Sequence, residues 1–111
     1  MEQEKLVGRD AHIARLRSGE RTSFRETGNS MMPKIRSRQR CTYAPIAGPE
    51  ELKKGDIVFC NVGRYHFTHL ISAIKGDGKD RLYQISNNKG HVNGWIPLEK
   101  IFGKVVEIHP D

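Results

Sequence analysis

A serine in the stretch GNSMMPKIR, residues 28–36, has neighbours that suit a nucleophile held in a rigid turn. Gly28 and Asn29 precede Ser30, and Pro33 ends the short apolar run that follows it. A serine hydroxyl becomes nucleophilic only when a nearby base accepts its proton. The glycine would let a substrate backbone come close, and the Ser30 N–H could stabilise an oxyanion. The alternative is an ordinary turn serine without a chemical role.

The main candidate bases for this serine are the five histidines of the chain: His12, His66, His69, His91 and His109. His12 lies in a weak helical segment and His109 lies next to the C-terminus. His66 and His69 fall on one expected strand, and a spacing of three sends them to opposite faces. Only one of them can therefore point at the serine. The same spacing argues against a zinc pair, so we expect neither a metal nor a cofactor.

The whole chain has a net charge of +6, and its basic residues are concentrated in the first part. In the run KIRSRQR, residues 34–40, every second residue is basic: Lys34, Arg36, Arg38 and Arg40. On a strand these four side chains would share one face and form a basic stripe. Such a stripe suits contact with nucleic acid or an acidic protein surface. It could equally be a solvated strand edge that discourages aggregation.

The size and composition indicate one soluble globular domain. The chain has 111 residues, of which 36% are hydrophobic and 29% charged. It contains no apolar run of the roughly 18 residues that would span a bilayer, and its first ten residues lack the apolar segment of a signal peptide. We therefore expect a cytoplasmic protein without a membrane partner, either a monomer or a homodimer. Cys41 and Cys60 have strand-like flanks and are expected to be reduced thiols in the core.

Turn residues divide the chain into short segments that are mostly β in character. Residues 1–20 could form an arm or a short helix that begins near Asp10 and ends at Gly19. The rest, residues 21–111, is expected to form one β domain. Its expected strands are residues 21–27, 40–46, 57–62, 64–74, 80–86 and 104–109, with a polar loop over 87–94 and one helical turn over 97–101. The pattern favours a compact, bent antiparallel β fold.

Four motifs in order resemble the LexA-like repressor proteases and the type I signal peptidases. They are GNSMMP, KKGDIVF, THLISAI and GWIPLEKIFGKVVEI, and together they span about residues 27–108. The resemblance implies a bent antiparallel sheet or partial barrel. It makes Ser30, in Ser30-Met31-Met32-Pro33, the nucleophile. The base of that family lies on a later strand, and the matching position is His69, 39 residues after the serine.

The same resemblance suggests roles for the residues around this pair. Gly28, Asn29 and Ser30 would form the turn that binds the oxyanion, and Met31 and Met32 would lie at the substrate groove. Histidine-type members orient the imidazole with an aspartate, but the matching stretch here is Ile85-Ser86-Asn87-Asn88. Asn87 or Asn88 could hold the histidine tautomer, although an amide does not stabilise an imidazolium as a carboxylate does.

The sequence therefore favours a serine peptidase-like hydrolase that uses a Ser30–His69 dyad on peptide bonds. Self-cleavage is one form of this activity, with Val7–Gly8 as the candidate bond. The alternative is an inactive peptidase fold that serves as a binding module. Such a module would hold a peptide, a host protein or nucleic acid, the last through the basic stripe. A phage or mobile element could use a protein of that kind against a host factor.

Overall fold

The computed structural model describes residues 8–110 and confirms a mainly β fold with a short N-terminal helix. Residues 1–7 of the expected arm lie outside the described residues. The helix and strands, in chain order, are α1 (Gly8–Arg17), β1 (Thr22–Arg25), β2 (Arg40–Ala44), β3 (Ile57–Val62), β4 (Tyr65–Lys75), β5 (Leu82–Ser86), β6 (Val92–Pro97) and β7 (Ile101–Ile108). Three short 3₁₀ turns, η1 (Pro49–Glu51), η2 (Gly78–Asp80) and η3 (Leu98–Lys100), connect some of them.

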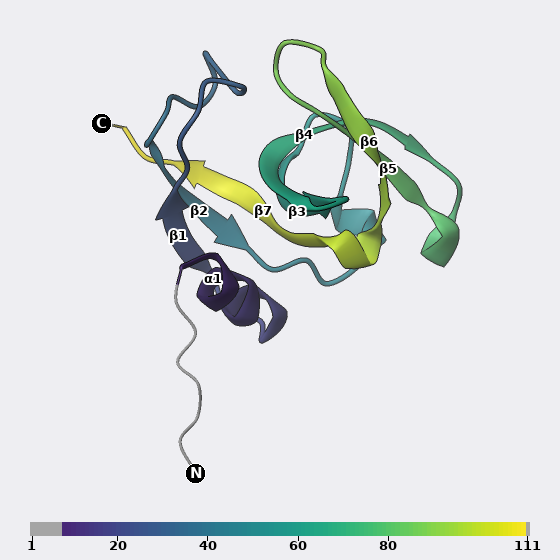
Figure 1. The fold of residues 1–111 in the computed structure, drawn as a ribbon. Coiled ribbons are helices and arrows are strands. Elements are labelled where there is room, and N and C mark those ends of the chain that lie inside the picture. Colours follow the sequence, from purple (N-terminus) through teal and green to yellow (C-terminus); the bar gives the residue numbers. More distant parts are fainter. Residues whose placement is uncertain (1–7, 111) are drawn as a thin grey trace.

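The strands form one antiparallel sheet that curls into a half-barrel (Figure 1). Their order is β1-β2-β7-β3-β4-β5-β6, so the last strand in the chain lies between the second and the third. The chain from β3 to β6 is a meander in which neighbours in sequence pair with each other. The last strand, β7, pairs with β2 on one side and with β3 on the other, and so joins this meander to the β1–β2 hairpin.

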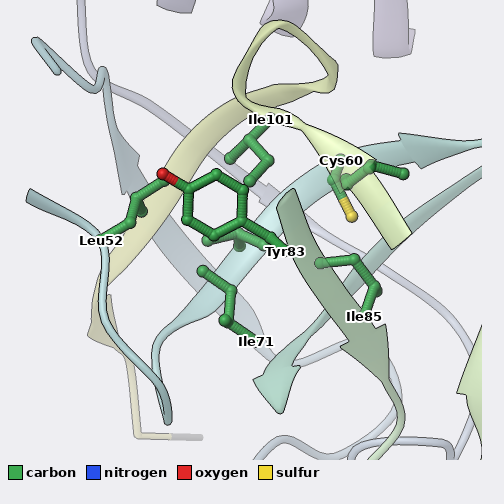
Figure 2. Packing of buried hydrophobic residues seen from close by; sticks show 8 residues of the cluster. Leu52, Cys60, Ile71, Tyr83, Ile85 and Ile101 are labelled. Atoms are coloured by element: carbon green, nitrogen blue, oxygen red, sulfur yellow. The ribbon is translucent and has the colours of Figure 1, made fainter. Parts of the chain in front are cut away.

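The central strand β3 is buried on both faces, because its residues alternate between two hydrophobic clusters. Val58 and Cys60 point into the cluster inside the curl, which Figure 2 shows around the ring of Tyr83. Ile57 and Phe59 point to the opposite face, into a second cluster beneath α1. A strand that is covered on both faces is expected to be an almost continuous apolar run, as IVFCNV is. The two clusters give the curled sheet a core on each side.

The helix α1 is held against the sheet mainly by one side chain. Leu16 is its single buried residue and is 3% exposed. Its methyl groups lie over Gly103 of β7, where a Cβ would come within 2.9 Å of Leu16 Cδ2 and 3.0 Å of the Ala44 carbonyl oxygen. The absence of a side chain at residue 103 therefore allows the helix to approach the strand closely.

The first half of β4 is paired with a neighbouring strand on one edge only. The pairing of β4 with β3 extends over the whole stretch from Tyr65 to Leu70. Its pairing with β5 begins only at Leu70, which lies opposite Ser86. Residues 65–69 therefore have a strand partner on one side only.

The strand β6 was not predicted, because residues 87–94 were expected to be a loop. The structure places the loop at residues 87–91 and starts β6 at Val92. Polar residues and Gly94 interrupt the alternating apolar pattern there, and a β-bulge shifts the register between Ile85 and Ser86 on the partner strand. Only Ile96 of this strand is buried, so the sequence carries a weak strand signal.

Both cysteines are free and buried, as expected from the sequence. Burial raises the pKa of the Cys60 thiol to about 12 and also raises the pKa of Cys41. No helix in residues 8–110 is long and apolar enough to cross a membrane.

We expect Leu16→Ala to lower the free energy of unfolding by about 2–5 kcal/mol, the usual cost of emptying a buried leucine site. Urea denaturation followed by circular dichroism would measure it. Val106→Ala is the matched control, since Val106 is 42% exposed and its truncation should cost no more than about 0.5 kcal/mol. Equal effects of the two substitutions would show that α1 does not depend on Leu16.

Candidate active site

Two of the residues singled out from the sequence meet across the fold. Ser30 lies in the loop after β1, and His69 lies on β4, where the strand has its open edge. The Oγ of Ser30 is 3.0 Å from Nε2 of His69, a hydrogen-bonding distance. The serine loop and the loop of residues 87–91 both lie at the top of Figure 1. The hydrogen bond from the Asn88 N–H to the Ser30 carbonyl joins these two loops.

The imidazole of His69 is fixed on three sides. It is 5% exposed, and its ring stacks on Phe67 with a centroid distance of 4.4 Å. Nδ1 is 2.7 Å from Oδ1 of Asn93. Because an amide oxygen only accepts hydrogen bonds, Nδ1 carries the proton and Nε2 keeps a lone pair toward Ser30. This is the tautomer that a general base for the serine needs.

Asn93 reaches the imidazole because it occupies a β-bulge. Val92 pairs with Ser86 and Gly94 pairs with Ile85, so Asn93 is the extra residue between them. Bulges commonly redirect a side chain near a functional site. Gly94 has a φ of +153°, and a Cβ there would lie 3.2 Å from Cγ1 of Val62. The Asn-Gly pair at residues 93–94 was the available sequence signal, but it was included in the expected loop.

The expectation that Asn87 or Asn88 orients the histidine is wrong. Oδ1 of Asn87 accepts the backbone N–H groups of Lys89 and His91, at 2.8 and 2.9 Å, and so shapes its own loop. Asn88 instead holds the serine loop: its N–H donates to the Ser30 carbonyl, and its side-chain amide donates to the Met32 carbonyl, both at 2.9 Å. The partner of His69 Nδ1 is Asn93 instead.

The turn around Ser30 leaves the N–H of the serine itself available as a backbone donor. Gly28 has a φ of +114°, which favours glycine, and its N–H donates to Ser37 Oγ at 3.0 Å. The N–H of Met32 donates to the Asn29 carbonyl. Within residues 8–110 no protein acceptor binds the N–H of Ser30. Of the expected oxyanion residues, Gly28 has its N–H bonded within the turn, whereas those of Asn29 and Ser30 have no acceptor among residues 8–110.

The two methionines after the serine have different environments. Met31 is 5% exposed and packs in the cluster beneath α1, whereas Met32 is 37% exposed. Neither lines the surface groove of about 660 Å³ that contains the dyad. The residues that line this groove, called the site groove below, are Arg25, Glu26, Thr27, Ser30, His66, Phe67, Thr68, His69, Asn87 and Asn93. Met31 anchors the serine loop and lines a small cavity beside the site groove, whereas Met32 lines neither of the two.

His66 and His69 point to opposite faces of β4, as expected from their spacing. The ring of His66 stacks on Phe102 at 5.9 Å, on the face toward α1. The ring of His69 stacks on Phe67, on the other face. In the described part of the chain, no three His, Cys, Asp or Glu side chains are grouped so that they could hold a metal ion.

The predicted basic stripe is not formed, because residues 34–39 are not a strand. The N–H of Ile35 donates to the Met31 carbonyl, so the chain coils here, and Ile35 and Gln39 become buried. Arg38 has a φ of 65°, and Arg40 alone belongs to β2. The four residues Lys34, Arg36, Arg38 and Arg40 are all exposed, but the first three lie outside any strand, so their alternation does not define one face.

The surroundings of His69 lower its pKa below the ordinary value of 6.5. Burial of the ring is the main cause, because it disfavours the charged form. The hydrogen bond to Asn93 opposes this shift, and the charge of His91 adds to it. The imidazole is therefore uncharged at neutral pH and able to accept a proton. Since the unfolded chain binds that proton more readily, stability should fall as the pH drops below about 6.5.

We expect an NMR titration of His69 to give a pKa below 6.5. In His91→Gln it should move up toward the ordinary value, since a neighbouring charge is lost. In Asn93→Asp it should rise further, because a carboxylate favours the imidazolium. A value at or above 6.5 in the unaltered protein would contradict the burial argument. His109→Gln is the control, and it should leave the titration of His69 unchanged.

Searches of known protein families, of curated proteins and of solved structures give no match for this chain.

Proposed function

We propose that this protein is a serine peptidase-like hydrolase that acts on peptide bonds in the site groove. The observation that carries the proposal is the chain of two hydrogen bonds from Ser30 Oγ to His69 and from His69 to Asn93, at 3.0 and 2.7 Å. A serine within reach of a base that is itself oriented by a third group is the arrangement of an activated nucleophile. The resemblance of the four motifs to the LexA-like proteases and signal peptidases supports the same proposal.

The proposed mechanism follows from the positions of these groups. His69 accepts the proton of Ser30 at Nε2 as Oγ attacks the substrate carbonyl carbon. The Ser30 N–H faces the resulting oxyanion. The imidazolium then donates its proton to the departing amine, which leaves an acyl group on Ser30. A water molecule, deprotonated by the same imidazole, hydrolyses that ester and restores the site.

The open edge of β4 gives the groove a natural way to hold a peptide. Residues 65–69 lack a partner on the β5 side, and an extended peptide could pair with such an edge through its backbone. The carbonyl to be attacked would then be held beside Ser30. A bond elsewhere in the same chain could also be a substrate. The candidate bond Val7–Gly8 cannot be placed in this way, because Val7 lies outside the described residues.

The second candidate is a binding module without catalysis. The same open edge favours it, because strand addition does not require the dyad. Nucleic-acid binding through residues 34–40 has lost its geometric support, since these residues do not form a stripe. A protein or peptide partner of the site groove is therefore the form of this alternative that fits the fold.

We expect a fluorophosphonate probe to label the protein at Ser30 at pH 8, as detected by intact-mass and peptide mass spectrometry. Ser30→Ala should not be labelled, and His69→Ala should be labelled about 10²- to 10⁴-fold more slowly, the usual loss of a general base. Ser72→Ala is the control, because its hydroxyl bonds to Gln84 away from the groove. A folded, unlabelled wild type would favour the binding module.

We also expect Asn93→Asp to raise the labelling rate by about tenfold. A carboxylate makes a stronger, charge-assisted hydrogen bond to the imidazolium that forms as the serine attacks, and tenfold corresponds to about 1.4 kcal/mol. Asn93→Leu should lower the rate instead. If both variants are folded and react as fast as the wild type, Asn93 does not position His69 during the reaction.

A further inference from the structure

A carboxyl group that the mechanism does not use lies beside the dyad. Glu26 follows β1 directly and is partly buried. Burial raises the pKa of its carboxyl, while hydrogen bonds from the side chain and backbone of Thr68 oppose the shift. Thr68 is itself bonded to the Tyr43 hydroxyl at 2.9 Å. Glu26 is therefore held in a defined place by a polar network through Thr68, the residue that precedes His69 in the sequence.

Glu26 also lines a second, smaller cavity of about 30 Å³. Its apolar walls include Met31, Ile35 and Cys41, which belong to the cluster beneath α1, and the polar residues Arg36, Gln39 and Tyr43 also line it. A single water molecule needs about 10–15 Å³. The cavity therefore has room for two or three atoms of that size, but a benzyl, isobutyl or long basic side chain would not fit.

This small cavity adjoins the site groove at the nucleophile. Four residues line both of them: Glu26, Thr27, Ser30 and Thr68. When a peptide carbonyl lies against Ser30 Oγ, the side chain on the adjacent Cα begins only two bonds from the attacked carbon. The cavity is thus in position to receive the side chain next to the bond that is cleaved.

The chemistry of the walls restricts which small side chain is favoured. A methyl group would fit, but it offers the carboxyl of Glu26 no hydrogen bond beyond those from Thr68. A carboxylate side chain would meet a like charge. A hydroxymethyl group fills the space and donates a hydrogen bond to the Glu26 carboxyl.

We infer that Glu26 is a specificity-determining residue, which selects substrates with a serine side chain next to the scissile bond. This inference rests on the proposed hydrolase function and adds the substrate class to it. A hydrogen bond to a charged group should favour the hydroxyl over a methyl by about 10- to 100-fold. Glu26 does not take part in the chemical steps and acts only on the bound side chain.

The inference can be tested with peptidyl diphenyl phosphonates that differ only in the side chain next to phosphorus. Attack by Ser30 Oγ forms a P–O bond, expels phenoxide and passes the serine proton to His69. We expect the full chain to react about 10- to 100-fold faster with the serine-type probe than with the alanine-type probe. The valine- and phenylalanine-type probes should be slower still, because of the size of the cavity.

Variants of Glu26 separate its role from that of the dyad. Glu26→Leu should react faster with the alanine-type probe than with the serine-type probe, and Glu26→Gln should show a reduced preference for serine. Because Glu26 lines the site groove, each variant is judged by the ratio of its own rates with the serine- and alanine-type probes and not by its absolute rate. Glu99→Gln is the control, since its side chain is exposed on η3.

The possible results distinguish the two proposals. If the small fluorophosphonate labels Ser30 but the serine- and alanine-type probes react equally, the selectivity is refuted and the hydrolase stands. If no probe labels the folded wild type, both proposals fall. Should Glu26→Leu fail to fold, as judged by circular dichroism, Glu26→Gln still decides: an unchanged preference would overturn the role of Glu26.

Discussion

The imidazole of His69 is the group on which the arrangement of the site depends, because it hydrogen-bonds to two segments that are distant in sequence. Through Nε2 it bonds to the serine loop after β1, and through Nδ1 it bonds to β6 near the end of the meander. Both bonds require an uncharged ring with its proton on Nδ1. Burial favours the uncharged form, so the packing of the ring and its hydrogen bonds support the same state.

The curled sheet brings these segments together through its two cores. The serine loop is anchored by Met31 and Ile35 in the cluster beneath α1. His69 shares a face of β4 with Phe67, which packs against the cluster inside the curl. The loop reaches from one core to the other around the open edge of β4. A strand that is paired on both sides at residues 65–69 would leave no passage, so the short pairing of β5 is part of the site.

Much of this fold and the two central residues of the site follow from local sequence patterns. Turn residues and alternating apolar residues correctly predicted six of the strands and allowed either an arm or a short helix at the N-terminus, and the resemblance of four motifs selected Ser30 and His69 as a pair. The partner Asn93 could not be found in this way, because a β-bulge directs its side chain and the register of β6 depends on contacts with β5. The stripe of Lys34, Arg36, Arg38 and Arg40 failed for a related reason. Its alternating charges were assigned to a strand, but the burial of Ile35 and Gln39 in a coiled segment determines the backbone there.

The burial of Cys41 and Cys60 has a practical consequence for chemical work on this protein. With a pKa of about 12, the sulfur of Cys60 is almost entirely protonated at neutral pH, and the pKa of Cys41 is shifted in the same direction. Neither sulfur competes for a mild electrophile, since the thiolate is the reactive form. A cysteine introduced on an exposed loop would then be the one readily alkylated sulfur of the chain. A fluorophore or spin label could be attached there without first removing the native pair.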